Sequence, residues 1–140
     1  MIVVDASLAV KWFLDEPLSD AAGEVLTEHS GEICVPDVML VEVNGALVRN
    51  ANMVKASRPN ILAALKRFEA LFAEGNIVAH RISPQTIRKS AHMAIDLGHP
   101  LKDCLYLALA IELGCDLVTC DARFAAKAKG VWSGVRVLGE

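Results

Sequence analysis

The sequence predicts an α/β fold, in which one domain carries a mainly parallel central sheet of about five strands with helices on both faces. Short apolar runs alternate along the chain with segments of helical periodicity, and no turn of the Asn-Gly type joins two apolar runs into a hairpin. The composition agrees with this prediction, because 140 residues with 54% hydrophobic and 22% charged side chains are enough for one packed core.

The expected strands are short runs rich in β-branched and aliphatic residues. The first run, Ile2-Val3-Val4, is apolar at every position, which is typical of a strand buried on both faces of a parallel sheet. The five expected strands are residues 2–4, 33–35, 77–79, 117–119 and 135–138.

The helices expected in the first half of the chain have recognisable start and stop residues. Residues 7–13 are expected to be helical, and Pro17 closes that segment. Ser19 is expected to cap a helix that stops at Gly31, and Asp37 is expected to cap the next helix.

In the second half of the chain, helices are expected over residues 57–75 and 83–98, from about residue 100, and over residues 122–129. The first of these has the clearest apolar stripe, and Gly75 is its expected end. The helix that starts near Pro100 is apolar almost all round through residues 104–110, which predicts that it is the buried central helix.

Four acidic residues lie where a strand should pass into a helix or in the first turns of a helix: Asp5, Glu42, Asp103 and Asp121. Because the carboxyl ends of parallel strands form one edge of an open α/β sheet, acids from distant parts of the chain can meet there. Converged carboxylates repel one another, and a divalent cation with oxygen ligands, usually Mg²⁺ or Mn²⁺, relieves this repulsion. The pattern therefore predicts metal-dependent phosphate chemistry.

Each of these acids also has a simpler interpretation. Asp5 and Asp121 could each cap the helix that follows, and Asp103 could complement a helix dipole. Glu42 discriminates between the interpretations, because it lies in an otherwise apolar helical stretch where a buried carboxylate needs water or a cation partner. We interpret the four acids as one site.

Other residue classes give little sign of chemistry. The net charge of −3 predicts no general basic field, and the apolar start of the chain is interrupted at Asp5, so neither a signal peptide nor a membrane span fits and we expect a cytoplasmic protein. The four histidines show no metal-binding spacing and are assigned no catalytic role, and the cysteines form no C-x-x-C pair and are expected to be reduced core thiols. These residues are His29, His80, His92, His99, Cys34, Cys104, Cys115 and Cys120.

Several segments together resemble the PIN-domain ribonucleases, and among them the VapC-type toxins of toxin-antitoxin pairs. The matching segments are residues 3–7 and 11–13, Glu42, residues 103–110, and residues 117–121 with Phe124 behind them. The resemblance covers nearly the whole chain in order and spacing.

This resemblance implies that Asp5, Glu42, Asp103 and Asp121 bind Mg²⁺ or Mn²⁺ and catalyse the reaction, with Ser7 and Thr119 as hydroxyl groups that orient the carboxylates or hold water. It implies a metal-dependent endoribonuclease that hydrolyses RNA by metal-activated water and leaves a 5′ phosphate, in a nuclease domain spanning residues 1–140. It also implies the role of toxin in a type II toxin-antitoxin system, a cognate antitoxin and a homodimer.

Basic side chains near the expected acids are candidates for contacts to RNA, although scattered solvated charge is an equally open interpretation. The candidates are Lys11, Arg49, Lys102 and Arg123, with Lys55 and Arg58 further along the same region as Arg49. Two rival functions are a catalytically silent PIN-fold binding or scaffold subunit and a receiver-like signalling domain. The receiver class requires adjacent acids after the first strand, whereas Asp5 stands alone there.

Overall fold

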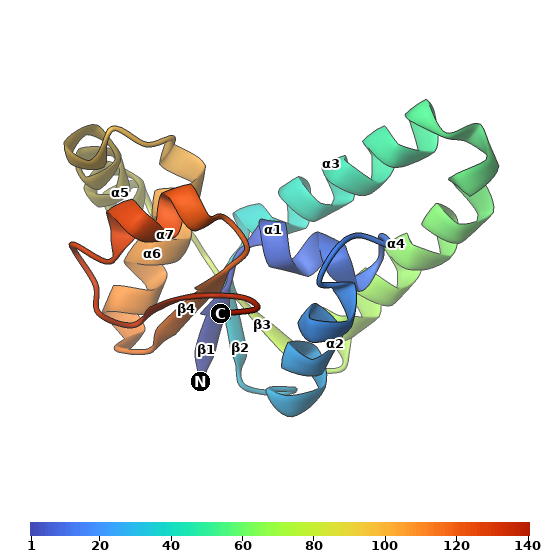
Figure 1. Cartoon of the computed structure of the whole chain (residues 1–140), viewed down its shortest axis with the longest axis horizontal. Helices are drawn as coiled ribbons and strands as arrows, with labels where there is room; N and C mark the ends of the chain where they lie inside the picture. Colours follow the sequence, from blue (N-terminus) through green and yellow to red (C-terminus); the bar gives the residue numbers. More distant parts are fainter.

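A computed structural model describes residues 1–140, and all five of its strands join one parallel sheet in the order β3-β2-β1-β4-β5 (Figure 1). The central strand β1 pairs with β2 through Val3 and Cys34 and with β4 through Val3 and Leu117. The strands are β1 (Ile2–Val4), β2 (Ile33–Pro36), β3 (Ile77–His80), β4 (Asp116–Thr119) and β5 (Val135–Val137). The predicted fold class is confirmed. Because strand order reverses between β1 and β4, the carboxyl ends of these two strands are where a ligand site is expected in such a sheet.

Helices lie on both sides of the sheet (Figure 1). The helices α5, α6 and α7 gather on one side of the strands, and α1 to α4 lie on the other, where α3 and α4 form a long pair that projects beyond the sheet. The helices are α1 (Ala6–Ala9), α2 (Ser19–Glu28), α3 (Val38–Met53), α4 (Arg58–Ala73), α5 (Pro84–Leu97), α6 (Leu101–Leu113) and α7 (Ala122–Ala128), with 3-10 turns η1 (Val10–Trp12) and η2 (Lys55–Ser57). None of these helices is both long and apolar enough to span a membrane.

The helix starts predicted at Ser19 and Asp37 need correction. Leu18, with a left-handed backbone (φ 69°), occupies the capping position of α2, and the Ser19 hydroxyl instead accepts from the Glu16 N–H and donates to the Leu14 carbonyl. Asp37 does precede α3, but its backbone is already helical and its side chain makes no capping bond. Both helices begin through local backbone geometry rather than through the predicted side-chain caps.

The core centres on α6, as its all-round apolar pattern predicts. Tyr106, Phe68 and Phe124 are the largest fully buried side chains. The four cysteines are free thiols, as expected, and burial raises the pKa of Cys104 to about 11. Because α6 is fixed in the core along most of its length, its first turn is held firmly at the carboxyl edge of the sheet.

Candidate metal centre

Asp5 directly follows β1 and is almost fully buried, with 3% of its surface exposed. Its Oδ1 accepts hydrogen bonds from the Ser7 hydroxyl (2.6 Å) and from the Leu8 N–H (3.2 Å), and its Oδ2 accepts one from the Thr119 hydroxyl. The bond from Leu8 caps α1, so the capping interpretation of Asp5 is correct. Capping uses only part of the carboxylate, and the two hydroxyls fix its orientation.

Burial of Asp5 raises its pKa to about 6, well above its ordinary value of 3.8. Desolvation is the main cause, and the nearby negative charge of Asp103 adds to it. The hydrogen bonds from Ser7, Thr119 and Leu8 act in the opposite direction. A cation beside Asp5 would favour its charged form and so remove part of this penalty.

Ser7 and Thr119 connect the ends of β1 and β4. The Ser7 Oγ accepts from the Cys120 N–H (3.1 Å), and the Thr119 Oγ1 accepts from the Asp121 N–H (3.0 Å), while both hydroxyls donate to Asp5. Thr119 is fully buried. These bonds place Asp5 and Asp121, which come from different strand ends, in one rigid framework.

Asp121 and Asp103 approach each other at the same edge. Asp121 caps α7 by accepting from the Phe124 N–H (3.0 Å), and Asp103 lies in the first turn of α6. His99 lies beside Asp103, with its Nε2 2.6 Å from Asp103 Oδ2. His99, Asp103 and Asp121 each offer one metal-binding atom, and these atoms all lie within 4.8 Å of one another.

Glu42 reaches the site from α3. Its Oε1 accepts a hydrogen bond from the buried Tyr106 hydroxyl (2.8 Å), and its Oε2 lies 3.6 Å from the Lys102 ammonium. Lys102 is therefore the cation partner that the position of Glu42 requires. Burial and the charges of Glu42, Asp5 and Asp103 raise the pKa of Tyr106, so these three carboxylates act on the same hydroxyl.

The residues present fit a divalent cation. Carboxylates from α3, α6 and the ends of β1 and β4 meet around one edge, and the hydrogen bonds leave one oxygen of Asp103 and one of Asp121 without a protein donor. Carboxylate oxygens are the ligands that Mg²⁺ and Mn²⁺ prefer. Asp103 and Asp121 lie together most closely, Asp5 is beside them, and Glu42 lies at Tyr106 rather than within the tight group.

The sequence interpretation missed His99 and Tyr106. A search for paired histidines could not find His99, but its position just before the helix start at Pro100, four residues ahead of Asp103, was the available signal. Tyr106 stands in an apolar run and gave no sign that its hydroxyl would reach Glu42.

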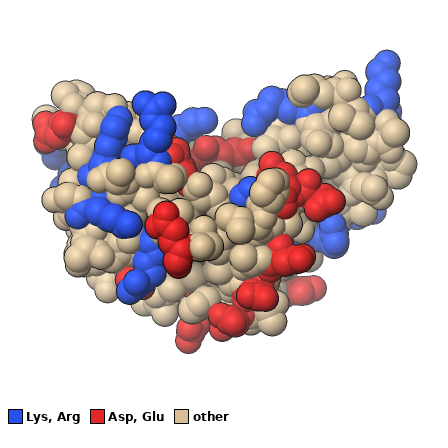
Figure 2. Space-filling view, in the orientation of Figure 1, with Lys and Arg blue, Asp and Glu red and all other residues tan.

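Basic side chains lie on both sides of a hollow in which acidic atoms are visible (Figure 2). Lysine and arginine gather over the α5 and α7 side and toward the tip of the α3–α4 pair, with acidic atoms in the hollow between them. Among the predicted RNA-binding residues, Lys102 lies beside Glu42, and Lys11 is mostly buried and 3.9 Å from Glu16. Arg49 lies in α3 and Arg123 in α7.

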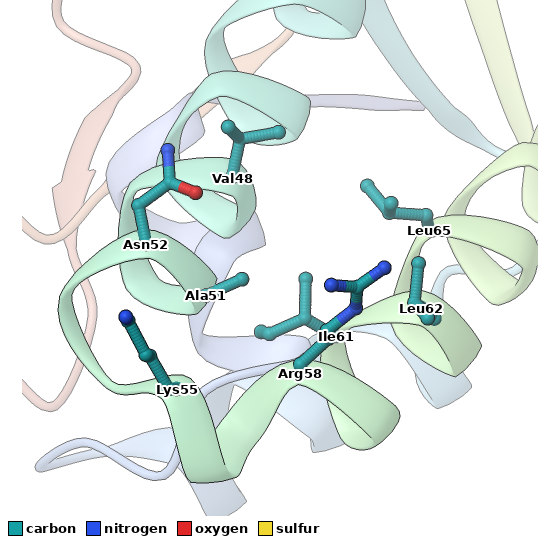
Figure 3. A pocket seen from close by; sticks show the side chains of 8 residues that line it. All are labelled: Val48, Ala51, Asn52, Lys55, Arg58, Ile61, Leu62 and Leu65. Atoms are coloured by element: carbon teal, nitrogen blue, oxygen red, sulfur yellow. The ribbon is translucent and has the colours of Figure 1, made fainter.

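A groove of about 450 Å³ lies away from the acids, between α3 and α4 (Figure 3). Its lining is mainly apolar, with two basic residues. The lining residues are Val48, Ala51, Asn52, Lys55, Arg58, Ile61, Leu62 and Leu65. Lys55 and Arg58 therefore border this groove.

Comparison with known proteins identifies related structures. The sequence profile of the PIN domain matches residues 2–130. PAE2754 from Pyrobaculum aerophilum shares the fold with 20% identity and a TM-score of 0.67, over 98% of this chain and 90% of that chain. VapC20 from Mycobacterium tuberculosis, a toxin that cleaves the sarcin-ricin loop, shares it with 14% identity and a TM-score of 0.69, over 90% of this chain and 94% of that chain. No curated protein sequence matches significantly.

Proposed function

We propose that this chain, which belongs to the PIN domain family, is a Mg²⁺- or Mn²⁺-dependent endoribonuclease whose residues 1–140 act as one nuclease domain. The observation that supports the proposal is that Asp103 and Asp121 offer carboxylate oxygens within 4.8 Å of each other. Asp5 lies close enough for the charge of Asp103 to act on it, and Glu42 approaches from α3 through its bond with Tyr106. A catalytically silent scaffold would not need all four carboxylates, so the enzyme is the better supported function.

In this mechanism Asp5, Asp103 and Asp121 would hold the metal, and Glu42 would complete the acidic edge. When bound there, a divalent ion would supply the Lewis acidity needed for a water molecule to attack the phosphate in line, which leaves a 5′ phosphate. Thr119 and Ser7 keep Asp5 in one orientation through their hydroxyls. Lys102, whose side chain is 65% exposed, neutralises Glu42 and stands where it can meet an RNA phosphate.

The RNA path follows the charge distribution. Arg49 belongs to α3 and Arg123 to α7, two helices that lie on different sides of the strands (Figure 1). Contacts from both helices would hold an RNA strand across the metal. Lys11 is the weakest of the four predicted contacts, because its side chain is only 13% exposed and is 3.9 Å from Glu16. We also propose that the protein acts in the cytoplasm. The homodimer stays a prediction.

Incubation of the purified protein with cellular RNA tests the proposal. We expect internal cleavage in Mg²⁺ or Mn²⁺ and none in EDTA, because the carboxylates cannot activate water without the metal. Intact RNA under both conditions, with a correctly folded protein, would favour the silent scaffold.

The role of a toxin in a type II toxin-antitoxin system is the biological setting we propose, since VapC20 shares the fold and is a toxin. An antitoxin could silence the acidic edge with an arginine or lysine, whose charge replaces the metal and whose hydrogen bonds suit carboxylates.

We predict that an antitoxin encoded by the neighbouring gene inhibits cleavage and weakens Mn²⁺ binding. Replacing the arginine or lysine that the antitoxin inserts among the acids by alanine should reduce both effects. Cleavage assays and Mn²⁺ titrations of the complex measure this. Equal inhibition with unchanged metal affinity would contradict the mechanism, even if the ribonuclease activity were present.

A further inference from the structure

We infer that His99 is a positioning residue of the metal centre: it fixes the carboxylate of Asp103 through a hydrogen bond and so holds a metal-binding oxygen in place. The inference rests on the proposed metal-dependent function. It adds to the four acids and the hydroxyls of Ser7 and Thr119 a residue that orients Asp103.

The contact between the two side chains is short and directional. His99 Nε2 lies 2.6 Å from Asp103 Oδ2, and because a carboxylate only accepts hydrogen bonds, Nε2 carries the proton and donates it. This bond uses one oxygen of Asp103 and leaves the other free for a cation. The exposed fraction of the His99 side chain is only 10%, so water competes little for the bond.

The imidazole itself is held from two directions. Its ring stacks on Phe124, with ring centroids 4.7 Å apart and an interplanar angle of 29°. Phe124 is fully buried, and its N–H binds Asp121 Oδ1 at 3.0 Å. One residue of α7 therefore supports the histidine that orients Asp103 and also binds Asp121, which couples the positions of the two acids.

The backbone of His99 is fixed by the turn between α5 and α6. Gly98 adopts a left-handed conformation (φ 62°) that glycine tolerates best, and its carbonyl accepts from the Lys127 ammonium of α7 at 2.9 Å. The His99 N–H donates to the Ala94 carbonyl at 3.0 Å. The ring thus reaches Asp103 from a rigid turn, and the hydrogen bond restricts the carboxylate rather than following it.

Three variants separate positioning from other roles. His99→Leu removes the donor but keeps an apolar contact with Phe124, and His99→Gln offers an amide N–H in a similar place. His29→Gln is the control, because it removes an imidazole that lies after α2, just before β2 begins, at the opposite edge of the sheet. Thermal unfolding in EDTA verifies that each variant is folded.

The measurement is the affinity for Mn²⁺ without RNA, by calorimetry, together with electron spin echo spectra of the bound ion. We expect His99→Leu to weaken Mn²⁺ binding about 10- to 100-fold, the usual effect of losing a partner that orients a metal ligand. His99→Gln should recover part of this loss and His29→Gln should match the wild type. In cleavage assays His99→Leu should need more Mn²⁺ while its KM for RNA stays unchanged.

Wild-type Mn²⁺ affinity in folded His99→Leu would overturn the inference, as would spectra in which a histidine nitrogen coordinates Mn²⁺ directly. The proposed nuclease function can fail while this inference holds. If the wild type bound Mn²⁺ but cut no RNA, a lower Mn²⁺ affinity of His99→Leu would still support the positioning role of His99.

Discussion

Asp5→Asn and Asp103→Asn are each expected to reduce RNA cleavage by about 10²- to 10³-fold or more while the protein remains folded. Each change removes one negative charge from the metal centre, and a metal held by fewer charges stabilises the transition state less. At Asp103 the amide also disturbs the bond to His99. Initial cleavage rates on one RNA substrate at saturating Mn²⁺, with circular dichroism as the check of folding, measure the effect.

Asp116→Asn is the matched control for these variants. Asp116 is also an aspartate at a strand end, but it begins β4 at the opposite edge of the sheet and binds Arg136 at 2.6 Å. It should cleave RNA at the wild-type rate. Undiminished cleavage by Asp5→Asn would remove Asp5 from the site, and equal losses in all three variants would point to a general effect on folding.

The metal-free protein is expected to lose stability as pH rises, because Asp5 must ionise in a buried position. The Asp5 pKa is about 6 in the folded state against 3.8 for the free side chain, so between these values the folded state binds the proton that the unfolded state has released. The stability that protonated Asp5 contributes is fully present below about pH 4 and is lost as pH rises through about 6. The difference corresponds to about 3 kcal/mol of unfolding free energy, an order-of-magnitude figure.

Asp5→Asn isolates this contribution from those of other acids. Urea unfolding in EDTA at about pH 4 and about pH 7 should give the variant a stability gain over the wild type that grows with pH by roughly 3 kcal/mol. Saturating Mn²⁺ should stabilise the wild type at neutral pH, because the metal binds only the folded state. A difference between wild type and variant that does not change with pH would show that Asp5 ionises normally.

The strands were predictable because each is a short apolar run of consecutive residues, and all five predicted runs form strands with ends within about one residue. The central helix α6 followed from its all-round apolar pattern. The starts of α2 and α3 were harder to predict. The Ser19 hydroxyl could bind neighbouring loop atoms as easily as the backbone of its own helix, and the local sequence does not distinguish these outcomes.

The part of the candidate site that was predictable is the convergence of acids that follow neighbouring strands. Asp5 and Asp121 follow strands that turned out to be neighbours, so their convergence came from the parallel order of the sheet. The contacts of His99 and Tyr106 depend instead on how α6 and α7 pack against the sheet and on the angle of the turn at Gly98. Periodicity and spacing do not specify those orientations.

Cleavage of RNA in water enriched in ¹⁸O tests the central proposal most directly, since it follows the oxygen that the metal should activate. Mass spectrometry of the products made in Mn²⁺ should find ¹⁸O in a new 5′ phosphate beside a 3′ hydroxyl, and no product should form in EDTA. Fragments that end in a 2′,3′-cyclic phosphate, or cleavage that persists in EDTA, would contradict a water activated by a metal that Asp5, Asp103 and Asp121 hold.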